Sequence, residues 1–474
     1  MEAISVDTQW AHEVFGYAEL GDIRRTNRLL RVAADLSRFC GASFCQANGK
    51  DAAAHEGAYR FIRNEAVEPQ AIVEAGFMAT ALKAEKVQTL LAVEDSTTLC
   101  YSHAVSAKLG DLGGPEQATG RGFFVHSTLL VDRQSEQTVG LIEQHYWMRP
   151  PQSRGQRHQR REREYVCKES YKWQRASERM RLRLGPETMA RVVSVCDRES
   201  DVYEYLSDKL KHGERFITRA SWNRRVQWDE AEGANVSHLF AALSHARQVA
   251  QVQIKIPQRG GRPARTTELT VQTLRVRLQC SVHKLNRGVP KHIGVNVVVA
   301  LELEPPPDSE PLEWILLTTE PVNTAEEALE VLRCYGLRWR VEEFHKAWKS
   351  GAGVERQRHQ EAGNLHRAAV VLAFVAVRLL QLREAMEQTP EDSCEVVLER
   401  LEWRVLWASV EQSKPPAQAP SLAWAYRALG KLARWTDTKR TGRIGWQTLW
   451  RGWHELQLRI EGYQAARFLS DAEM

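Results

Sequence analysis

Residues 89–95 read Thr-Leu-Leu-Ala-Val-Glu-Asp, a short apolar run that ends in two acids. Such a run is typical of a strand that is buried within a sheet. A second run, Val192-Val-Ser-Val-Cys196, is followed directly by Asp197. Because open α/β sheets bind ligands at the ends of their strands, Asp95 and Asp197 are predicted to lie at such a rim. With 60 carboxylates in the chain, loop caps and salt bridges are the commoner explanation for either acid taken alone.

The sequence around these two runs predicts a mixed α/β sheet. Residues 123–131 and 139–147 resemble two further strands, joined by the hairpin-type turn Asp132-Arg-Gln-Ser135. A helical pattern at 200–212 then precedes a last strand at 215–219. Strands and helices in this order favour a sheet covered by helices.

Residues 221–321 break that order. Residues 249–256 and 269–278 alternate apolar and polar side chains, as half-buried strands do. Two more β-type runs follow at 295–303 and 314–319. We therefore expect an all-β insertion between two parts of the α/β core.

Helical patterns dominate both ends of the chain. Thr324-x-x-Glu327 is a capping box, which predicts a helix that continues, with a break at Gly336, to about Ser350. Helical periodicity then runs to the C-terminus. We accordingly divide the chain into a helical domain at 1–70, an α/β domain at 71–370 and a second helical domain at 371–474.

Length and composition indicate a globular protein of several domains. At about 150 residues per domain, 474 residues suggest roughly three. The chain is 43% hydrophobic and 26% charged, which excludes wholesale disorder. Its net charge of +5 permits a polyanionic partner without demonstrating one.

The same sequence points to a soluble protein without a membrane partner. The longest apolar run, at 368–377, is shorter than the roughly 20 residues that cross a bilayer. The first residues are acidic where a signal peptide would be basic. The eight cysteines are scattered without a C-x-x-C pair, so we expect reduced, mostly buried thiols in the cytosol.

A third acid lies in a polar pattern near residue 340. Tyr335, Arg338, Glu342 and Lys349 are separated by 3, 4 and 7 residues, and two helical turns hold about 7.2, so one helix would align all four. Glu342 could then bind a metal ion while the other three side chains grip phosphates. The alternative is an exposed helix with ion pairs along its surface.

The N-terminal region is rich in arginine. Arg24, Arg28 and Arg31 follow a helical period, and Arg60 and Arg63 lie beside two aromatic residues. From the residue types alone, a solvated surface and a nucleic-acid contact are equally good interpretations.

These motifs together resemble the DDE transposases with a ribonuclease H-like core, and more narrowly the IS-Four insertion-sequence family. The resemblance rests on Asp95 in LLAVEDSTT, Asp197 in VCDRESD and the spacing that begins at Tyr335. Nearly the whole chain contributes further motifs: LGDIRRTNRL, GAYRFIRN, RGFFVHS at 121–127, WRVEEFHKAWKSGAGVERQR at 339–358, FVAVRLLQLRE at 374–384 and DTKRTG with its Trp-rich tail.

The resemblance implies a cut-and-paste transposase. Asp95, Asp197 and Glu342 would be the catalytic acids and would bind two Mg2+ ions, for which Mn2+ could substitute. The implied reaction nicks a transposon end, forms and opens a DNA hairpin, and joins the end to target DNA. Its implied partners are double-stranded DNA and a second copy of the chain in a homodimer. The implied location is the bacterial cytoplasm, at the nucleoid.

The resemblance also implies DNA contacts. Trp314 would stack on a base flipped out of the hairpin, although a core tryptophan in a strand is the simpler interpretation from sequence alone. Trp339 could be a second stacking platform. The implied contacts to transposon-end phosphates are Arg24, Arg28, Arg60 and Arg63.

Three other features have more than one interpretation: a tryptophan stripe and two departures from the family. Trp446, Trp450 and Trp453 form an aromatic stripe that is most simply core, whereas the resemblance implies a dimerisation surface nearby. The Arg-rich residues 150–164 depart from the family and could add DNA affinity or be disordered. Tyr203 occupies a position where the family has a histidine. Whether this chain keeps the role of that histidine, such as helping to open the hairpin, is therefore open.

Two alternative functions stay open at this point. A metal-dependent endonuclease would cut DNA without joining ends to a target. A catalytically idle DNA-binding regulator would do neither, and the presence of all three acids argues against it.

Overall fold

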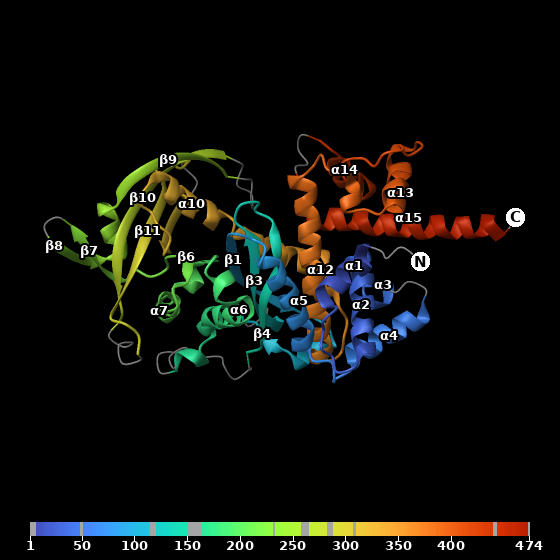
Figure 1. Cartoon of the computed structure of the whole chain (residues 1–474), viewed down its shortest axis with the longest axis horizontal. Helices are drawn as coiled ribbons and strands as arrows, with labels where there is room; N and C mark the ends of the chain where they lie inside the picture. Colours follow the sequence, from blue (N-terminus) through green and yellow to red (C-terminus); the bar gives the residue numbers. More distant parts are fainter. Residues whose placement is uncertain are drawn as a thin grey trace.

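The computed structural model shows an elongated protein with a β-rich end and a helical end (Figure 1). The central sheet lies between them, and both chain termini lie at the helical end. The structure describes residues 6–47, 51–113, 120–149, 163–230, 233–256, 265–281, 288–306, 310–438 and 443–472.

The described strands form one 12-stranded sheet. Its order is β2-β3-β1-β5-β6-β12-β11-β10-β7-β8, with β4 paired to β3 and β9 paired to β10. β1 pairs in parallel with β5, and β5 with β6, whereas β1 and β3 are antiparallel. The strand bounds are β1 Leu90–Cys100, β2 Gly110–Asp111, β3 Arg121–Asp132, β4 Thr138–Trp147, β5 Val192–Cys196, β6 Arg215–Arg219, β7 Arg225–Glu230, β8 Gly233–His238, β9 Arg247–Ile256, β10 Arg265–Gln279, β11 His292–Glu302 and β12 Glu313–Thr318. This arrangement confirms the mixed α/β prediction.

The strands of the predicted insertion continue the central sheet. β12 pairs with β11 on one side and with β6 on the other, both antiparallel. The insertion therefore shares its backbone hydrogen bonds with the core. It also contains a short helix, α8 (Leu239–Ala242), among its strands.

Helices cover the sheet and build the helical end (Figure 1). Their bounds, besides α8, are α1 Val6–Phe15, α2 Ile23–Arg38, α3 Phe44–Ala47, α4 Ala52–Arg63, α5 Pro69–Ala84, α6 Lys172–Met189, α7 Tyr203–Lys211, α10 Ala325–Gly336, α11 Trp339–Lys346, α12 Ala362–Gln388, α13 Arg400–Glu411, α14 Leu422–Leu432 and α15 Trp446–Ala472. The predicted capping box at Thr324 is present, with Glu327 as its partner. The predicted break falls after Gly336, between α10 and α11.

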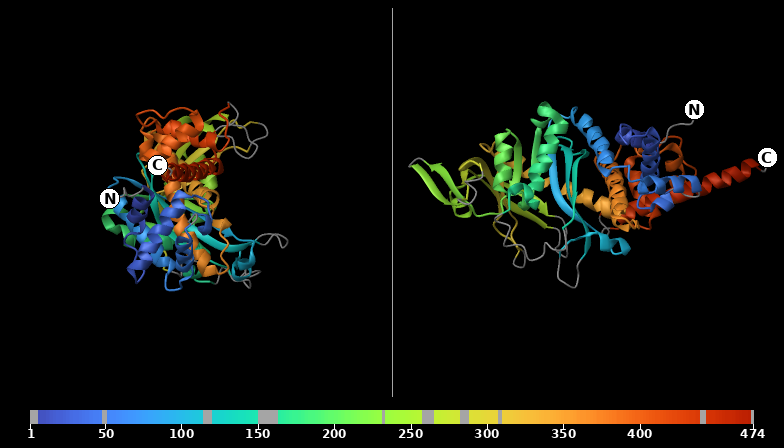
Figure 2. Two further views of the ribbon diagram at one scale, coloured as in Figure 1. Left: turned by 90° about the vertical axis from the view of Figure 1, so that its right-hand side faces the viewer. Right: turned by 90° about the horizontal axis from the view of Figure 1, so that it is seen from below.

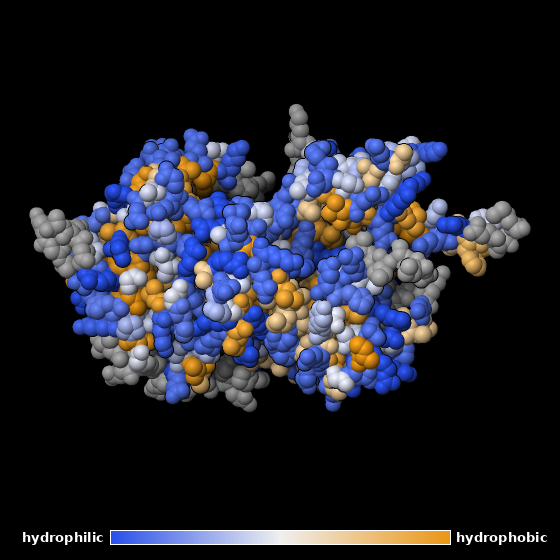
Figure 3. All heavy atoms as spheres, viewed as in Figure 1, coloured by the Kyte–Doolittle hydropathy of each residue, from blue (hydrophilic) through white to orange (hydrophobic). Residues whose placement is uncertain are grey.

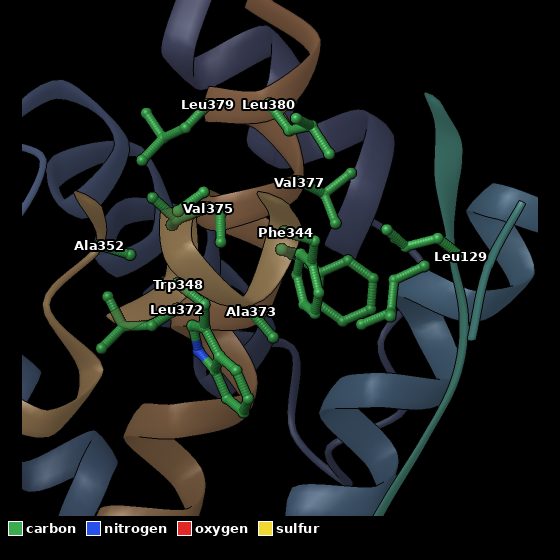
Figure 4. Packing of buried hydrophobic residues seen from close by; sticks show 14 of the residues in the cluster. Leu129, Phe344, Trp348, Ala352, Leu372, Ala373, Val375, Val377, Leu379 and Leu380 are labelled. Atoms are coloured by element: carbon green, nitrogen blue, oxygen red, sulfur yellow. The ribbon is translucent and has the colours of Figure 1, made fainter. Parts of the chain in front are cut away.

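The long helix α12 is the centre of the core. An 18-residue stretch of this helix is apolar enough to span a membrane, but 83% of that stretch is buried inside the protein. Its Phe374 packs edge-on against Phe15 of α1, with the ring centroids 5.3 Å apart. Figure 4 shows residues of this helix, including Leu372 and Val375, against Phe344 and Trp348. Residue 370, a predicted domain boundary, lies within this continuous helix.

The C-terminal helix has two different halves. Trp446, Trp450 and Trp453 are all buried, as expected for a core stripe. Residues 461–470 are all exposed, and this end of α15 extends away from the body of the protein (Figure 2). Figure 3 shows a mostly polar face, with apolar groups at the projecting end. The seven described cysteines are all free, and five of them are buried, in agreement with the prediction of reduced thiols.

Asp35 on α2 carries a prediction for stability. Burial raises the pKa of its carboxyl from 3.8 to about 6, against the opposing charges of Arg38 and Arg31. The folded protein thus holds this proton more tightly than the unfolded chain, and the free energy of unfolding falls as the pH rises from 3.8 to about 6. Asp35→Asn cannot ionise, so it should be more stable than the wild type at pH 7 by about 3 kcal/mol.

Urea unfolding at several pH values tests this expectation. The gain from Asp35→Asn should shrink toward pH 3, below both pKa values, where the wild-type carboxyl is mostly protonated in both states. Glu19→Gln, at an exposed site, is the control and should change the stability by no more than about 0.5 kcal/mol. An equal gain from Asp35→Asn at both ends of the pH range would contradict the titration of Asp35.

Candidate active site

The first two acids lie on β1 and directly after β5, two neighbouring parallel strands. Asp95 is in the middle of β1 and not at its end, which differs from the prediction. β1 continues because residues 96–100 keep pairing with β3, as far as Cys100 opposite Gly122. The parallel pairing with β5, however, ends with Glu94 opposite Cys196. Asp95 and Asp197 are therefore each the first residue beyond that pairing.

Arg338 connects the third acid, Glu342, to Asp95. Arg338 lies between α10 and α11. Its guanidinium donates to Asp95 Oδ2 at 3.2 Å and to Glu342 Oε1 at 2.6 Å. Asp197 Oδ1 accepts a hydrogen bond from the backbone N–H of Glu199 at 2.9 Å. Three segments far apart in the sequence thus come together where the parallel pairing of β1 with β5 ends.

The three acids share an electrostatic environment. Burial raises the pKa of Asp95, and the negative charges of Asp197 and Glu342 raise it further, while Arg338 opposes the shift. Burial also raises the pKa of Asp197. Carboxylates this close disfavour each other's charge, and a cation among them relieves that cost. In this structure Arg338 supplies the cation.

The three acids are of the residue type that binds divalent metal ions. Three carboxylates are the oxygen ligands that Mg2+ and Mn2+ prefer. Among the described residues, no group of three Asp, Glu, His or Cys side chains is packed closely enough to hold an ion, and Arg338 lies between Asp95 and Glu342. A cation bound among the three acids would nevertheless relieve the charge repulsion that Asp197 and Glu342 exert on Asp95.

The residues of the predicted stripe are spread over two helices. Tyr335 is on α10, Glu342 is on α11, and Lys349 lies in a π-helical turn, Ala347–Gly351. The break after Gly336 was predicted, whereas the wider π turn, which shifts Lys349 relative to a regular helix, was not. Lys349 Nζ lies 3.9 Å from Glu355 Oε1.

Trp314 contacts Tyr335, and Trp339 lies three residues before Glu342. Tyr335 is buried, and its ring lies edge-on to Trp314 of β12, with the centroids 5.2 Å apart. Trp314 is half-buried, so part of its ring remains exposed. Trp339 is 36% exposed, and the guanidinium of Arg340 lies 4.7 Å from its ring centroid. Both tryptophans lie near the acids in sequence or in space, and their stacking roles stay predictions.

Sequence reasoning missed two charged residues here. Arg219 ends β6, the strand next to β5, and its charge affects the pKa of Tyr335. The strand-end argument that selected Asp197 could also have found it. Glu355 accepts a hydrogen bond from the backbone N–H of Cys100 at 2.9 Å and so connects the end of β1 to the segment after Lys349. No local pattern marks that contact.

The four predicted arginines of the N-terminal region lie on α2 and α4, which pack together. Arg24 pairs with Asp22 and Arg60 with Glu56, and both guanidinium groups are largely exposed. The Arg28 guanidinium lies against Gly57, where a Cβ would come within 2.3 Å of it. Arg63 is exposed and lies 5.2 Å from the ring centroid of Tyr59.

Two features depart from the family, Tyr203 and the Arg-rich residues 150–164, and the structure describes only the first of them fully. Tyr203 is fully buried, and its hydroxyl donates to the carbonyl oxygen of Pro290 at 2.9 Å. This phenol is therefore part of the packing between α7 and the loop before β11. Most of the Arg-rich segment, residues 150–162, lies outside the described residues.

Comparison with known families agrees with this architecture. Residues 7–67, which include α2 and α4, match the family described as transposase DNA-binding. Residues 116–378 match the transposase DDE domain, and this match covers more than half of the chain. Asp197 and Glu342 lie inside that match, and Asp95 precedes it. The DDE domain implies that the central sheet is a ribonuclease H-like core. With an N-terminal DNA-binding domain and a DDE domain on a mixed sheet, the chain belongs to the DDE transposases.

Proposed function

We propose that this transposase works by a cut-and-paste mechanism of the IS-Four type. It would nick a transposon end, form and open a hairpin, and join the freed end to target DNA. The observation that supports this proposal most directly is the meeting of Asp95, Asp197 and Glu342 around Arg338. Such a cluster can serve both hydrolysis and the attack of a DNA hydroxyl, because neither reaction needs a protein nucleophile.

Asp95, Asp197 and Glu342 would hold two Mg2+ ions, with Mn2+ as a substitute. When bound, the ions would lower the pKa of the attacking hydroxyl and stabilise the leaving oxygen. Arg338 would then turn from the acids toward a DNA phosphate, which its planar guanidinium can grip with two hydrogen bonds. Lys349 would add a second positive charge at the same edge.

The hairpin intermediate would need a place for an unstacked base. Trp314 is half-buried and its ring contacts Tyr335, which in turn interacts with Arg338. A flipped base could therefore stack on Trp314 while its phosphate contacts Arg338. Trp339 would be a second platform.

We also propose a homodimer that brings two transposon ends together in the bacterial cytoplasm, at the nucleoid. The projecting half of α15 favours a surface for the second copy. Four large apolar side chains on this helix are between 46% and 74% exposed: Leu458, Tyr463, Phe468 and Leu469. Isolated exposed apolar residues are common, but four on one projecting helix are typical of an interface.

One experiment separates the proposed reaction from its alternatives. The DNA that flanks the gene is read for matched inverted repeats, and purified protein is incubated with these ends, Mg2+ and a target plasmid. A hairpin on a denaturing gel, followed by ends joined to the plasmid, supports cut-and-paste transposition. Cleaved ends without joined product indicate an endonuclease. Binding without cleavage indicates a regulator. Reactions with chelator, or with scrambled ends, are the controls.

Arg63 provides a test of the DNA-binding region. If it contacts a phosphate, Arg63→Ala should weaken binding to all sequences alike and lower the slope of log affinity against log salt by about 1. Arg427→Ala removes the same charge from the exposed surface of α14 and is the matched control. Titrations at several salt concentrations measure both slopes. An unchanged slope for Arg63→Ala would remove Arg63 from the interface.

A further inference from the structure

Glu343 follows Glu342 on α11 and connects this helix to the C-terminal region. Consecutive helical residues point about 100° apart, so the two acids face different sides. Glu342 faces Arg338 at the acid cluster. Glu343 Oε2 instead accepts a hydrogen bond from Trp446 Nε1 at 2.9 Å, and Arg383 donates to the same oxygen at 3.3 Å.

Trp446 is the first residue of α15, and its indole is held from two directions. It is 8% exposed. The guanidinium of Arg383, on α12, lies 4.2 Å from its ring centroid. On another side the ring of Trp450 stacks on it, with the centroids 5.8 Å apart and the planes at 24°. The indole N–H is therefore fixed in its direction toward Glu343.

The helix that carries Glu342, α11, is too short to hold a fixed orientation without contacts to the rest of the protein. α11 has 8 residues and lies between the break at Arg338 and the π-helical turn. Helices of this length are not stable alone in water, so tertiary contacts must set the rotation of α11 about its axis. One such contact is Arg340 to Glu384 of α12, at 2.9 Å, and Glu384 also accepts from Thr138 of β4. Others are the buried side chains of Val341 and Phe344 and the contacts that Glu343 makes with Arg383 of α12 and with Trp446.

We propose that Trp446 is a positioning residue for the active site. By holding Glu343 it fixes the rotation of α11, and through that rotation it sets the place of Glu342 relative to Asp95. The first turn of the C-terminal helix is then part of the catalytic apparatus, separate from any dimer contact made by its projecting end. The inference rests on the proposed role of Glu342 in catalysis.

A pair of tryptophan variants tests this assignment. Trp446→Phe keeps most of the buried ring but has no N–H to donate to Glu343. Trp450→Phe is the matched control, because it keeps an aromatic ring against Trp446, lies one turn away on α15 and is also buried, and the Trp450 Nε1 that it removes has no hydrogen-bond partner within the described residues. Both variants should lose similar stability in urea unfolding and should bind transposon ends like the wild type.

Three measurements distinguish the two variants. Hydrogen exchange of the α11 backbone amides should be faster in Trp446→Phe only. Trp446→Phe should cut transposon ends about tenfold more slowly than the wild type. It should also need about tenfold more Mg2+ for half-maximal cleavage. Effects of this size are usual when a group that orients a metal ligand is lost. Glu343→Gln should act in the same direction, and the double variant should lose less than the sum of the two single losses.

The results also separate this inference from the proposed function. If wild-type protein cuts no ends, the proposed function fails, and the exchange measurement still tests the contact. If the wild type is active and Trp446→Phe matches Trp450→Phe in exchange, cleavage and Mg2+ dependence, Trp446 is only a packing residue. If Trp446→Phe does not fold, Glu343→Gln with normal exchange and cleavage overturns the inference.

Discussion

Asp95→Asn is expected to lower the rate of end cleavage by about a thousandfold or more, which corresponds to about 4 kcal/mol of transition-state stabilisation. The amide keeps an acceptor for the backbone N–H of Ser96, which Asp95 Oδ1 accepts at 2.7 Å. The change removes one negative charge from the acid cluster. The free energy of unfolding should therefore stay the same or rise slightly, since Asp197 and Glu342 repel the wild-type charge.

The measurement is single-turnover cleavage of a labelled transposon end, with DNA binding followed by gel shift. Glu199→Gln is the matched control, since it makes the same chemical change in the turn after Asp197, at a side chain that is 65% exposed and paired with Lys172. It should cut at the wild-type rate. Asp95→Asn with wild-type cleavage would exclude the proposed chemistry. Loss of binding as well as cleavage would instead indicate a folding defect.

Trp348→Ala is expected to cost about 3–5 kcal/mol in the free energy of unfolding, the range for truncating a large buried aromatic residue. Trp348 is completely buried. Its ring stacks on Phe344 with the centroids 5.8 Å apart, and its Nε1 donates to the carbonyl oxygen of Ala369 at 3.2 Å. Truncation leaves a cavity between the π-helical turn and α12, and it also leaves that carbonyl without its partner (Figure 4).

Urea unfolding followed by circular dichroism measures this loss. Trp222→Ala is the control, because the Trp222 side chain is 62% exposed and its truncation should change the stability by no more than about 0.5 kcal/mol. Equal losses from the two substitutions would contradict the packing described for Trp348.

Much of the fold follows from local sequence patterns. The run that ends at Cys196 predicted a buried strand and placed Asp197 correctly just beyond it. The capping box at Thr324 predicted the start of α10, and Gly336 marked its end. These signals are local, because backbone hydrogen bonds and caps depend on residues within a few positions.

Other features depend on contacts that no local pattern encodes. The apolar run before Asp95 predicted that the strand would stop there, but pairing with β3 extends it to Cys100. Helical spacing predicted one stripe from Tyr335 to Lys349; Arg338 does pair with Glu342, but a π turn that the spacing does not signal carries Lys349. The hydrogen bond between Trp446 and Glu343 joins residues 103 positions apart, and their spacing carries no signal for it.

The position of α12 has a consequence for how the chain folds. Its apolar surface is covered by residues that come before it, such as Phe15 and Phe77, and by α14, which comes after it. During synthesis this helix therefore emerges before some of its cover exists. Neither half of the polypeptide can enclose it alone, so the regions on its two sides should unfold together in one transition. Truncated versions that end soon after residue 388 should aggregate through the helix that they leave uncovered.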